Sequence, residues 1–245
     1  AVELFTMAAE KGEVGAMLGL GNMYRDGKGV VQSFKKAADF FTMAGEQGHV
    51  SAMFNLALLY RDGQGVVQSF KKAIELYTMA AEQGHVNAMF NLASSYDEGA
   101  GVDQSDGKAI HYYTMAAEQG HVDAMFNLAL MYKNGQGVPQ SNKTAREWFT
   151  KAKDVGCEGA IEQLRLLDAQ EGKPAAIEKA VEQGDLCAMN DLGTLYQHGK
   201  GVVQSSEKAA ELYTMAAEQG YVNAMFNLAH MYQYGQGVPQ SNKTA

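Results

Sequence analysis

The chain has 245 residues, of which 46% are hydrophobic, and its formal net charge is −8. An acidic chain without a cluster of Lys and Arg repels phosphate backbones, which argues against nucleic acid as a partner. No run reaches the roughly 18 apolar residues of a membrane-spanning helix, so we expect no membrane insertion in this segment. The two cysteines, Cys157 and Cys187, take non-equivalent places in adjacent repeats. No disulfide therefore recurs with the repeat, and the compartment stays open.

The chain begins within a predicted helix. Its first residues, AVELFTMAAE, align with AIELYTMAAE at residues 73–82, and its last five, SNKTA, repeat residues 141–145. We therefore interpret the chain as an excerpt from a longer array. Apolar residues at both ends lack the helices that cover their equivalents elsewhere, so we expect end-to-end self-association. These residues are Val2, Phe5, Met7, Leu228, Met231 and Tyr232.

A period of 36 residues organises the chain, because glycines close helix-like runs at Gly12, Gly48, Gly84, Gly120 and Gly156. Self-similarity at such a period is typical of solenoids, in which each unit contacts mainly its neighbours and the product is an extended surface. We predict a single array over residues 1–245 with about seven helix-pair units. An extended surface favours binding over catalysis.

Residues Val86–Gly120 show the unit best. The segment NAMFNLASSY spaces apolar residues three and four apart, which predicts a helix that is apolar on more than one side. A second helical segment, KAIHYYTMAAEQ, ends at Gly120, where a left-handed cap needs a residue without Cβ. The link between the two segments has the form GxGVxQS. Its glycines permit positive φ, and its Ser can cap the following helix.

The pattern A-M-F-N-L-A-x-x-Y, then GxGVxQS, then K-A-x-x-x-Y-T-M-A-A-E-Q-G resembles the Sel-one-like repeat (SLR), a branch of the tetratricopeptide-repeat superfamily. The resemblance covers essentially the whole chain. It implies an all-α fold, a right-handed α-solenoid superhelix of antiparallel helix pairs, with the first helix of each pair lining the concave side. Copies of the pattern start at Ala16, Ala52, Ala88, Ala124, Ala188 and Ala224.

One unit, residues 157–184, departs from the pattern. It has no GxGVxQS link, and the interval from Gly156 to Gly184 falls to 28 residues. We expect its two helices to turn within about Ala169–Lys173, with Pro174 in the first turn of the second helix, where its missing N–H costs nothing.

Two rows of methionine recur at helical spacing beside alanines, which favours core packing over a Met-rich binding surface. One row is Met7, Met43, Met79, Met115 and Met215, and the other is Met17, Met53, Met89, Met125, Met189 and Met225.

His49, His85 and His121 follow the helix-ending glycines, one in each unit. Packed helices lie roughly 8–10 Å apart and each unit contributes two, so equivalent histidines are too far apart to share one metal ion. No Ser/His/Asp or Cys/His set recurs. We therefore predict no metal, no cofactor and no catalytic residue.

The strongest functional signal is a polar residue inside the apolar first helix. A buried amide without a partner costs about 1–3 kcal/mol, so its recurrence predicts either a structural partner or a ligand. By resemblance to tetratricopeptide arrays, the Asn and the preceding Phe face the groove. The alternative is that each Asn bonds the adjacent helix and each Phe packs between units. The candidate peptide- or protein-binding residues, including charges at the rim, are Phe54, Asn55, Arg61, Phe90, Asn91, Phe126, Asn127, Lys133, Asp191, Phe226 and Asn227.

The sequence thus favours a non-enzymatic scaffold or adaptor that binds a peptide or a partner protein in its concave groove. Cysteine-rich members of the resembled family are associated with β-lactam binding or hydrolysis, which gives an enzyme as the alternative, although their periodic disulfides are absent here. A purely structural spacer is the third hypothesis. The partner, the compartment and the oligomeric state stay open.

Overall fold

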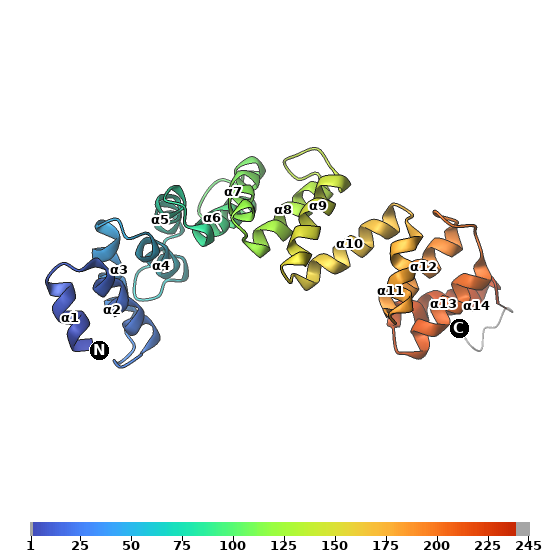
Figure 1. The fold of residues 1–245 in the computed structure, drawn as a ribbon, viewed down its shortest axis with the longest axis horizontal. Helices are drawn as coiled ribbons and strands as arrows, with labels where there is room; N and C mark the ends of the chain where they lie inside the picture. The colour runs from blue at the N-terminus through green and yellow to red at the C-terminus, as the bar shows by residue number, and fades with distance from the viewer. Residues whose placement is uncertain (1, 239–245) are drawn as a thin grey trace. The chain divides into compact units, whose positions relative to one another are not determined.

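The computed structural model describes residues 2–238, apart from the side chains of Ala175 and Ala176, and all regular structure in this part is helical (Figure 1). The contacts divide the chain into two compact units, Ala1–Val155 and Gly156–Ala245. Unit 1 contains α1 (Val2–Glu10), α2 (Val14–Asp26), α3 (Phe34–Glu46), α4 (Val50–Asp62), α5 (Phe70–Glu82), α6 (Val86–Glu98), α7 (Asp106–Glu118), α8 (Val122–Asn134) and α9 (Asn142–Asp154). Unit 2 contains α10 (Glu158–Gln170), α11 (Pro174–Glu182), α12 (Leu186–His198), α13 (Ser206–Glu218) and α14 (Val222–Tyr234).

Within each unit, every helix packs against the next one along the chain. We call the helices with the AMFNLA-type sequence A helices; they are α2, α4, α6, α8, α12 and α14. The helices after the long links are B helices, namely α3, α5, α7, α9 and α13. This stacking of helix pairs confirms the predicted all-α solenoid class. The prediction of one continuous array over 1–245 stays a prediction.

Each B helix buries one aromatic ring at the same place in the repeat. Full burial of such a side chain contributes roughly 1.5–3 kcal/mol. The small residues that flank the ring, mostly alanine, let the A helices approach it closely. The rings belong to Phe41, Tyr77, Tyr113, Phe149 and Tyr213.

The long link owes its shape to the residues of the GxGVxQS motif. Gly63 caps α4 with φ of 68°, and the Ser69 side chain accepts a hydrogen bond from the Lys72 N–H at the start of α5. The Gln68 side chain donates to the Arg61 carbonyl at 2.8 Å. A Cβ on Gly65 would lie 2.2 Å from the Phe34 carbonyl carbon, so the link presses against the start of the preceding B helix. The predicted glycine and serine roles are confirmed.

The short unit turns where the sequence predicts. α10 ends at Gln170, and α11 begins at Pro174, which stands in the first turn. The link after α12 packs on this turn, since a Cβ on Gly201 would clash with the carbonyl of Gly172. Gly172 therefore takes the place that the start of a B helix takes in the longer units.

The core prediction is confirmed for one methionine row and wrong for the other. The A-helix row is buried from Met17 to Met189, whereas Met225 is 43% exposed. In the B-helix row, the side chain of Met79 is 47% exposed, and Met7, Met43 and Met215 are similar, whereas Met115 is half-buried. The B-helix methionines follow the buried aromatic ring by two positions, about 200° around the helix, so they lie on the opposite face of the B helix from that ring.

The first and last described helices expose only part of the predicted apolar set, since Val2, Leu228 and Tyr232 are half-buried. Phe5 and Met7 are exposed on α1, and Phe226 on α14 is 69% exposed. Met231, predicted to be exposed, is fully buried because it packs with α13 residues such as Tyr213. No described helix is long and apolar enough to cross a membrane.

Candidate functional site

The predicted phenylalanines pack mainly between helices. Phe54 stacks on His85 with ring centroids 4.5 Å apart, and Phe90 stacks on His121 at 4.4 Å. Each ring also lies beside the buried tyrosine of the following B helix, Tyr77 or Tyr113. Phe126 instead meets Phe149 edge to face at 5.5 Å, and Phe226 is exposed at the end of unit 2. Three of the four rings are therefore half-buried, and only that of Phe226 lies largely open to solvent.

The recurring histidines are caps of the A helices. The Nδ1 atoms of His85 and His121 accept the N–H groups of Ala88 and Ala124 at 3.2 and 3.3 Å. Burial lowers the pKa of both imidazoles, which favours the neutral form that this bond requires. His49 makes no such bond. Among the residues that the structure describes, no group of three or more His, Cys, Asp or Glu could hold a metal ion.

The predicted asparagines find partners in three of four positions. The Asn55 amide donates to Asn22 Oδ1 at 3.2 Å, and the Asn127 amide donates to the Tyr113 hydroxyl at 3.2 Å. In unit 2, the Asn227 amide donates to Asn190 Oδ1 at 2.9 Å. These bonds match the alternative that each Asn bonds a neighbouring helix. Asn91 differs, because its side chain lines a cavity.

The predicted charged residues are also engaged. Arg61 forms a salt bridge with the adjacent Asp62 at 2.7 Å. In unit 2, Asp191 pairs with Arg165, which also binds Glu162 through its Nε at 3.1 Å. Burial raises the pKa of Asp191, and Arg165 opposes this rise. The ion pairs of Arg165 involve α10 and α12. Lys133 is half-buried at the end of α8, where its carbonyl accepts the side chain of Gln140 at 2.8 Å.

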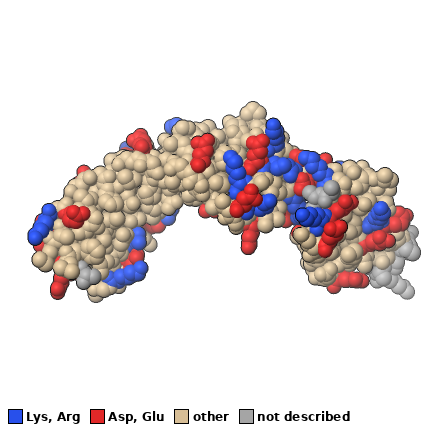
Figure 2. All heavy atoms as spheres, viewed as in Figure 1, with Lys and Arg blue, Asp and Glu red and all other residues tan. Residues whose placement is uncertain are grey.

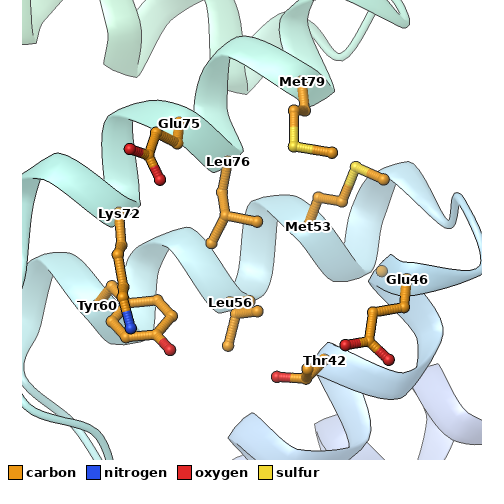
Figure 3. A pocket seen from close by; sticks show the side chains of 10 residues that line it. Thr42, Glu46, Met53, Leu56, Tyr60, Lys72, Glu75, Leu76 and Met79 are labelled. Atoms are coloured by element: carbon orange, nitrogen blue, oxygen red, sulfur yellow. The ribbon is translucent and has the colours of Figure 1, made fainter.

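The structure brings together a second surface, which the sequence did not single out. We call it the methionine groove, a cavity of about 300 Å³ lined by α3, α4 and α5 (Figure 3). Its floor is apolar and belongs to α4, and α5 supplies a wall on which Leu76 and Met79 point toward that floor. The opposite wall is the end of α3. The lining residues are Thr42, Gly45, Glu46, Met53, Leu56, Tyr60, Lys72, Glu75, Leu76 and Met79.

The charged groups of the methionine groove are unevenly paired. The Lys72 ammonium lies over the Tyr60 ring, 4.9 Å from its centroid, where the ring face attracts the cation. Glu46 and Glu75 have no salt bridge in the described part of the chain. The groove is therefore apolar at its centre and carries two free carboxylates at its edges.

The same arrangement recurs along the chain. In unit 1 a cavity between α2 and α3 is lined by Tyr24, Lys36, Asp39, Phe40 and Met43, the equivalents of five groove residues. In unit 2 the equivalent cavity takes Leu192 and Tyr196 from α12 and Lys208, Glu211 and Leu212 from α13. A lysine lies over a tyrosine ring in four repeats, at 4.7–5.0 Å from its centroid. On the face drawn in Figure 2, α4–α6 carry few charged side chains.

Two signals in the sequence mark the methionine groove in retrospect. The pairing of Tyr60 with Lys72 twelve positions later recurs as Tyr24 with Lys36 and predicts a shared face. Gly45 takes the place of Ala81 and Ala117 in the next repeats, and the missing methyl group widens the groove above Met53.

Comparison with known proteins agrees with the repeat pattern. The chain is 30% identical to a protective antigen present in uropathogenic Escherichia coli strains that displays an SLR fold, with a TM-score of 0.74 over 99% of this chain and 54% of that one. It is 32% identical to a Sel1 repeat protein from Oxalobacter formigenes, with a TM-score of 0.64 over 100% of this chain and 74% of that one. The chain thus spans about half the length of the E. coli protein. No curated protein matches it.

The repeats themselves are recognised individually. The model of the Sel1 repeat matches residues 1–13, 14–49, 50–85, 86–121, 122–157, 188–221 and 222–245. The residues between these matches, 158–187, contain most of the short unit that lacks the link. With matches over most of its length, the chain belongs to the Sel1 repeat family.

Proposed function

We propose that this chain is a non-enzymatic interaction scaffold that holds an extended segment of a partner protein in the methionine groove. Sel1 repeats commonly serve as protein–protein interaction scaffolds. The observation that supports this site is the half-exposed Met79, set among apolar side chains of three helices beside two carboxylates without salt bridges.

The lining indicates the chemistry of the segment. Methionine is flexible and polarisable, so Met53 and Met79 can adapt to apolar side chains of different shapes. Burying such a side chain contributes up to about 1.5–3 kcal/mol. Glu46 and Glu75 favour a basic residue beside it, because opposite charges lower the energy of the complex. The segment is therefore apolar and basic in alternation, with its apolar residues spaced to reach neighbouring cavities such as that of Met43.

A random peptide library selected on the protein tests the proposal. We expect the selected peptides to shift the methyl resonances of Met53 and Met79 in protein labelled with ¹³C at the methionine methyl groups. Met79→Glu removes the apolar contact and places a charge in the apolar centre of the groove, so it weakens binding at least about tenfold. Met225→Glu is the matched control, because Met225 is similarly exposed but lies on α14.

Gly45→Ala is a second test that keeps the fold. Gly45 has a helical φ, and its added Cβ would meet Met53 Cγ at 3.5 Å, an ordinary contact. Alanine also favours the helix by up to about 1 kcal/mol. We expect equal or higher thermal stability together with weaker peptide binding. Peptides that bind both variants as they bind the wild type would disprove the groove as the site.

The two other hypotheses make different predictions. A β-lactam-hydrolysing enzyme would turn over nitrocefin, whereas we expect no hydrolysis above the buffer rate. Both cysteines are free in the structure. A purely structural spacer would yield no selected peptide and no shift of the methionine resonances. The Asn and Phe residues of the A helices remain a second proposed contact surface.

A further inference from the structure

A second cavity, of about 230 Å³, lies on the opposite face of α5 from the methionine groove. We call it the Tyr77 cavity. Its apolar part comes from α5, through Phe70, Ala73 and Ile74. Its polar part comes from the end of α4, from Tyr77 and from α6. The polar lining residues are Arg61, Tyr77, Asn91, Ser94, Ser95 and Glu98.

Two serines of α6 open this cavity. Ser94 and Ser95 stand where α4 has Leu58 and Leu59, and Leu59 is fully buried. The other A helices from α8 onward keep a large apolar residue at the position of Ser95, such as Met131. In this repeat alone a small hydroxyl side chain leaves the space unfilled. The Ser95 hydroxyl donates to the Asn91 carbonyl at 2.8 Å and leaves the cavity centre free.

The buried hydroxyl of Tyr77 points to a missing partner. Tyr77 is 1% exposed, and its Oη is buried without a hydrogen-bond partner. Burial raises the pKa of Tyr77, so the hydroxyl keeps its proton; Arg61 and Asn91 lie near enough to oppose the rise, yet neither meets the oxygen with hydrogen-bond geometry. An orphaned buried hydroxyl costs about 1–3 kcal/mol.

The equivalent tyrosines of other repeats show that the fold does not require an unpaired hydroxyl at this position. The Tyr113 hydroxyl accepts the Asn127 amide at 3.2 Å. The Tyr213 hydroxyl donates to Gln197 Oε1 at 3.0 Å and lies 3.0 Å from the Thr194 hydroxyl. Among the three tyrosines, only Tyr77 has an unpaired hydroxyl.

We propose that the Tyr77 cavity binds a carboxamide group, the side-chain chemistry of glutamine and asparagine. The Tyr77 hydroxyl donates to the carboxamide oxygen, and the Asn91 amide lies beside it as a second donor. Glu98 at the rim accepts the carboxamide N–H. A carboxylate is disfavoured because Glu98 and Asp62 lie near, and a cation is disfavoured by Arg61, so a neutral group with both a donor and an acceptor fits best.

Nuclear magnetic resonance with small probes tests the assignment. We expect N-acetyl-glutamine methylamide to shift the amide resonances of Tyr77, Asn91 and Ser95. N-acetyl-glutamate methylamide and N-acetyl-leucine methylamide should bind at least about fivefold more weakly, because each loses one hydrogen bond or adds a repelled charge. Acetamide distinguishes a free small amide from a carboxamide side chain of a partner protein. If acetamide binds as tightly as the glutamine probe, the ligand is a free amide. If it binds more weakly and shifts the same residues, the ligand is a side chain of a partner.

Matched variants come from the repeats themselves. Tyr77→Phe copies Phe41 and Phe149, and Ser95→Leu copies Leu59, so both residues are already accommodated at these positions. We expect both variants to bind the glutamine probe at least about fivefold more weakly with an equal or higher melting temperature. The control Tyr113→Phe breaks a satisfied bond, so it lowers the melting temperature and leaves probe binding unchanged.

Three results would overturn the proposal. The first is the absence of any shift at Tyr77 with the glutamine probe, which would mean that the cavity holds only water. The second is equal or tighter binding of the glutamate or leucine probe. The third is a Tyr77→Phe variant that loses stability as Tyr113→Phe does, since its hydroxyl would then have a structural partner. None of these results bears on the methionine groove, which shares no lining residue with the cavity.

Discussion

His85 and His121 each cap one helix and stack on one ring, and the cap needs a neutral imidazole because its Nδ1 accepts a backbone N–H. Burial lowers the pKa of both residues from the ordinary value of 6.5. The unfolded chain therefore binds these protons more readily than the folded chain. The stabilisation is complete above about pH 6.5 and decreases as the pH falls toward the folded-state pKa values.

We expect the double variant His85→Asn and His121→Asn to reduce this dependence, because Asn caps a helix without titrating. Its overall stability should fall, since it also loses the stacking with Phe54 and Phe90. Urea midpoints between about pH 5 and pH 7 measure both effects. If the urea midpoint of the double variant changed with pH as steeply as that of the wild type, other groups would cause the pH dependence.

Asn127 and Asn91 occupy equivalent positions in different surroundings. Substituting each one therefore distinguishes a structural role of these asparagines from a ligand-binding role. Asn127→Ala leaves the buried Tyr113 hydroxyl without its donor, so we expect a loss of about 1–3 kcal/mol in the free energy of unfolding. Asn91→Ala should cost less, since the Tyr77 hydroxyl is already unpaired. Urea denaturation compares them. If the variant that carries both substitutions instead keeps its stability and binds the partner about tenfold more weakly, the asparagines form a row of hydrogen bonds to the partner.

At the scale of helices, Arg165 replaces the alanine that other repeats have at its position, such as Ala129, and ties α10 to α12. Arg165→Ala would leave Asp191 half-buried and unpaired, which costs unit 2 up to about 3–5 kcal/mol by analogy with buried pairs. Adding Asp191→Asn restores the residue type of Asn55 and removes the lone charge. We expect the double variant to regain most of the lost stability in thermal unfolding, and a double variant as unstable as the single one would contradict this.

The parts of the fold that follow from local chemistry were predictable. The cap of Ser69, the φ of Gly63 and the turn before Pro174 each depend on a few neighbouring residues. Surfaces were harder to predict, because helical spacing tells which residues share a face but not what covers it. The rows of Met53 and Met79 recur with the same period in the sequence. Only the packing of the helices shows that Met53 is buried and Met79 is half-exposed.

The candidate sites depend on contacts between repeats, which periodicity alone does not reveal. Asn55 meets Asn22 across 33 residues, and the Ser95 substitution matters because Tyr77 of the preceding helix faces it. A buried Asn was correctly expected to need a partner or a ligand, but the sequence could not choose between them. The Ser94–Ser95 substitution is confined to one repeat and is visible in the sequence, but the sequence does not show that it opens a cavity beside Tyr77.

At the scale of the whole molecule, the end helices expose apolar side chains whose equivalents elsewhere are more buried. Phe226 and Met225 on α14 are exposed, as is Phe5 on α1, whereas Phe41 and Met125, the equivalents of Phe5 and Met225, are buried. Apolar patches of this kind promote association. We expect the sedimentation coefficient to rise with protein concentration, and Phe5→Glu combined with Phe226→Glu to abolish the rise. A wild-type chain that is monomeric at all concentrations would refute this prediction.

The link that presses Gly65 against Phe34 recurs as Gly101 against Phe70 and Gly137 against Asp106, always reaching one repeat back. Each of these link contacts joins the start of one B helix to the link of the following repeat. Removing or inserting whole periods recreates a junction of the same kind, whereas an insertion of any other length inside a link separates its two sides. Gene duplication and loss can thus edit such a chain in complete repeats, and a specialised repeat such as that of Tyr77 and Ser95 can be gained without altering those around it.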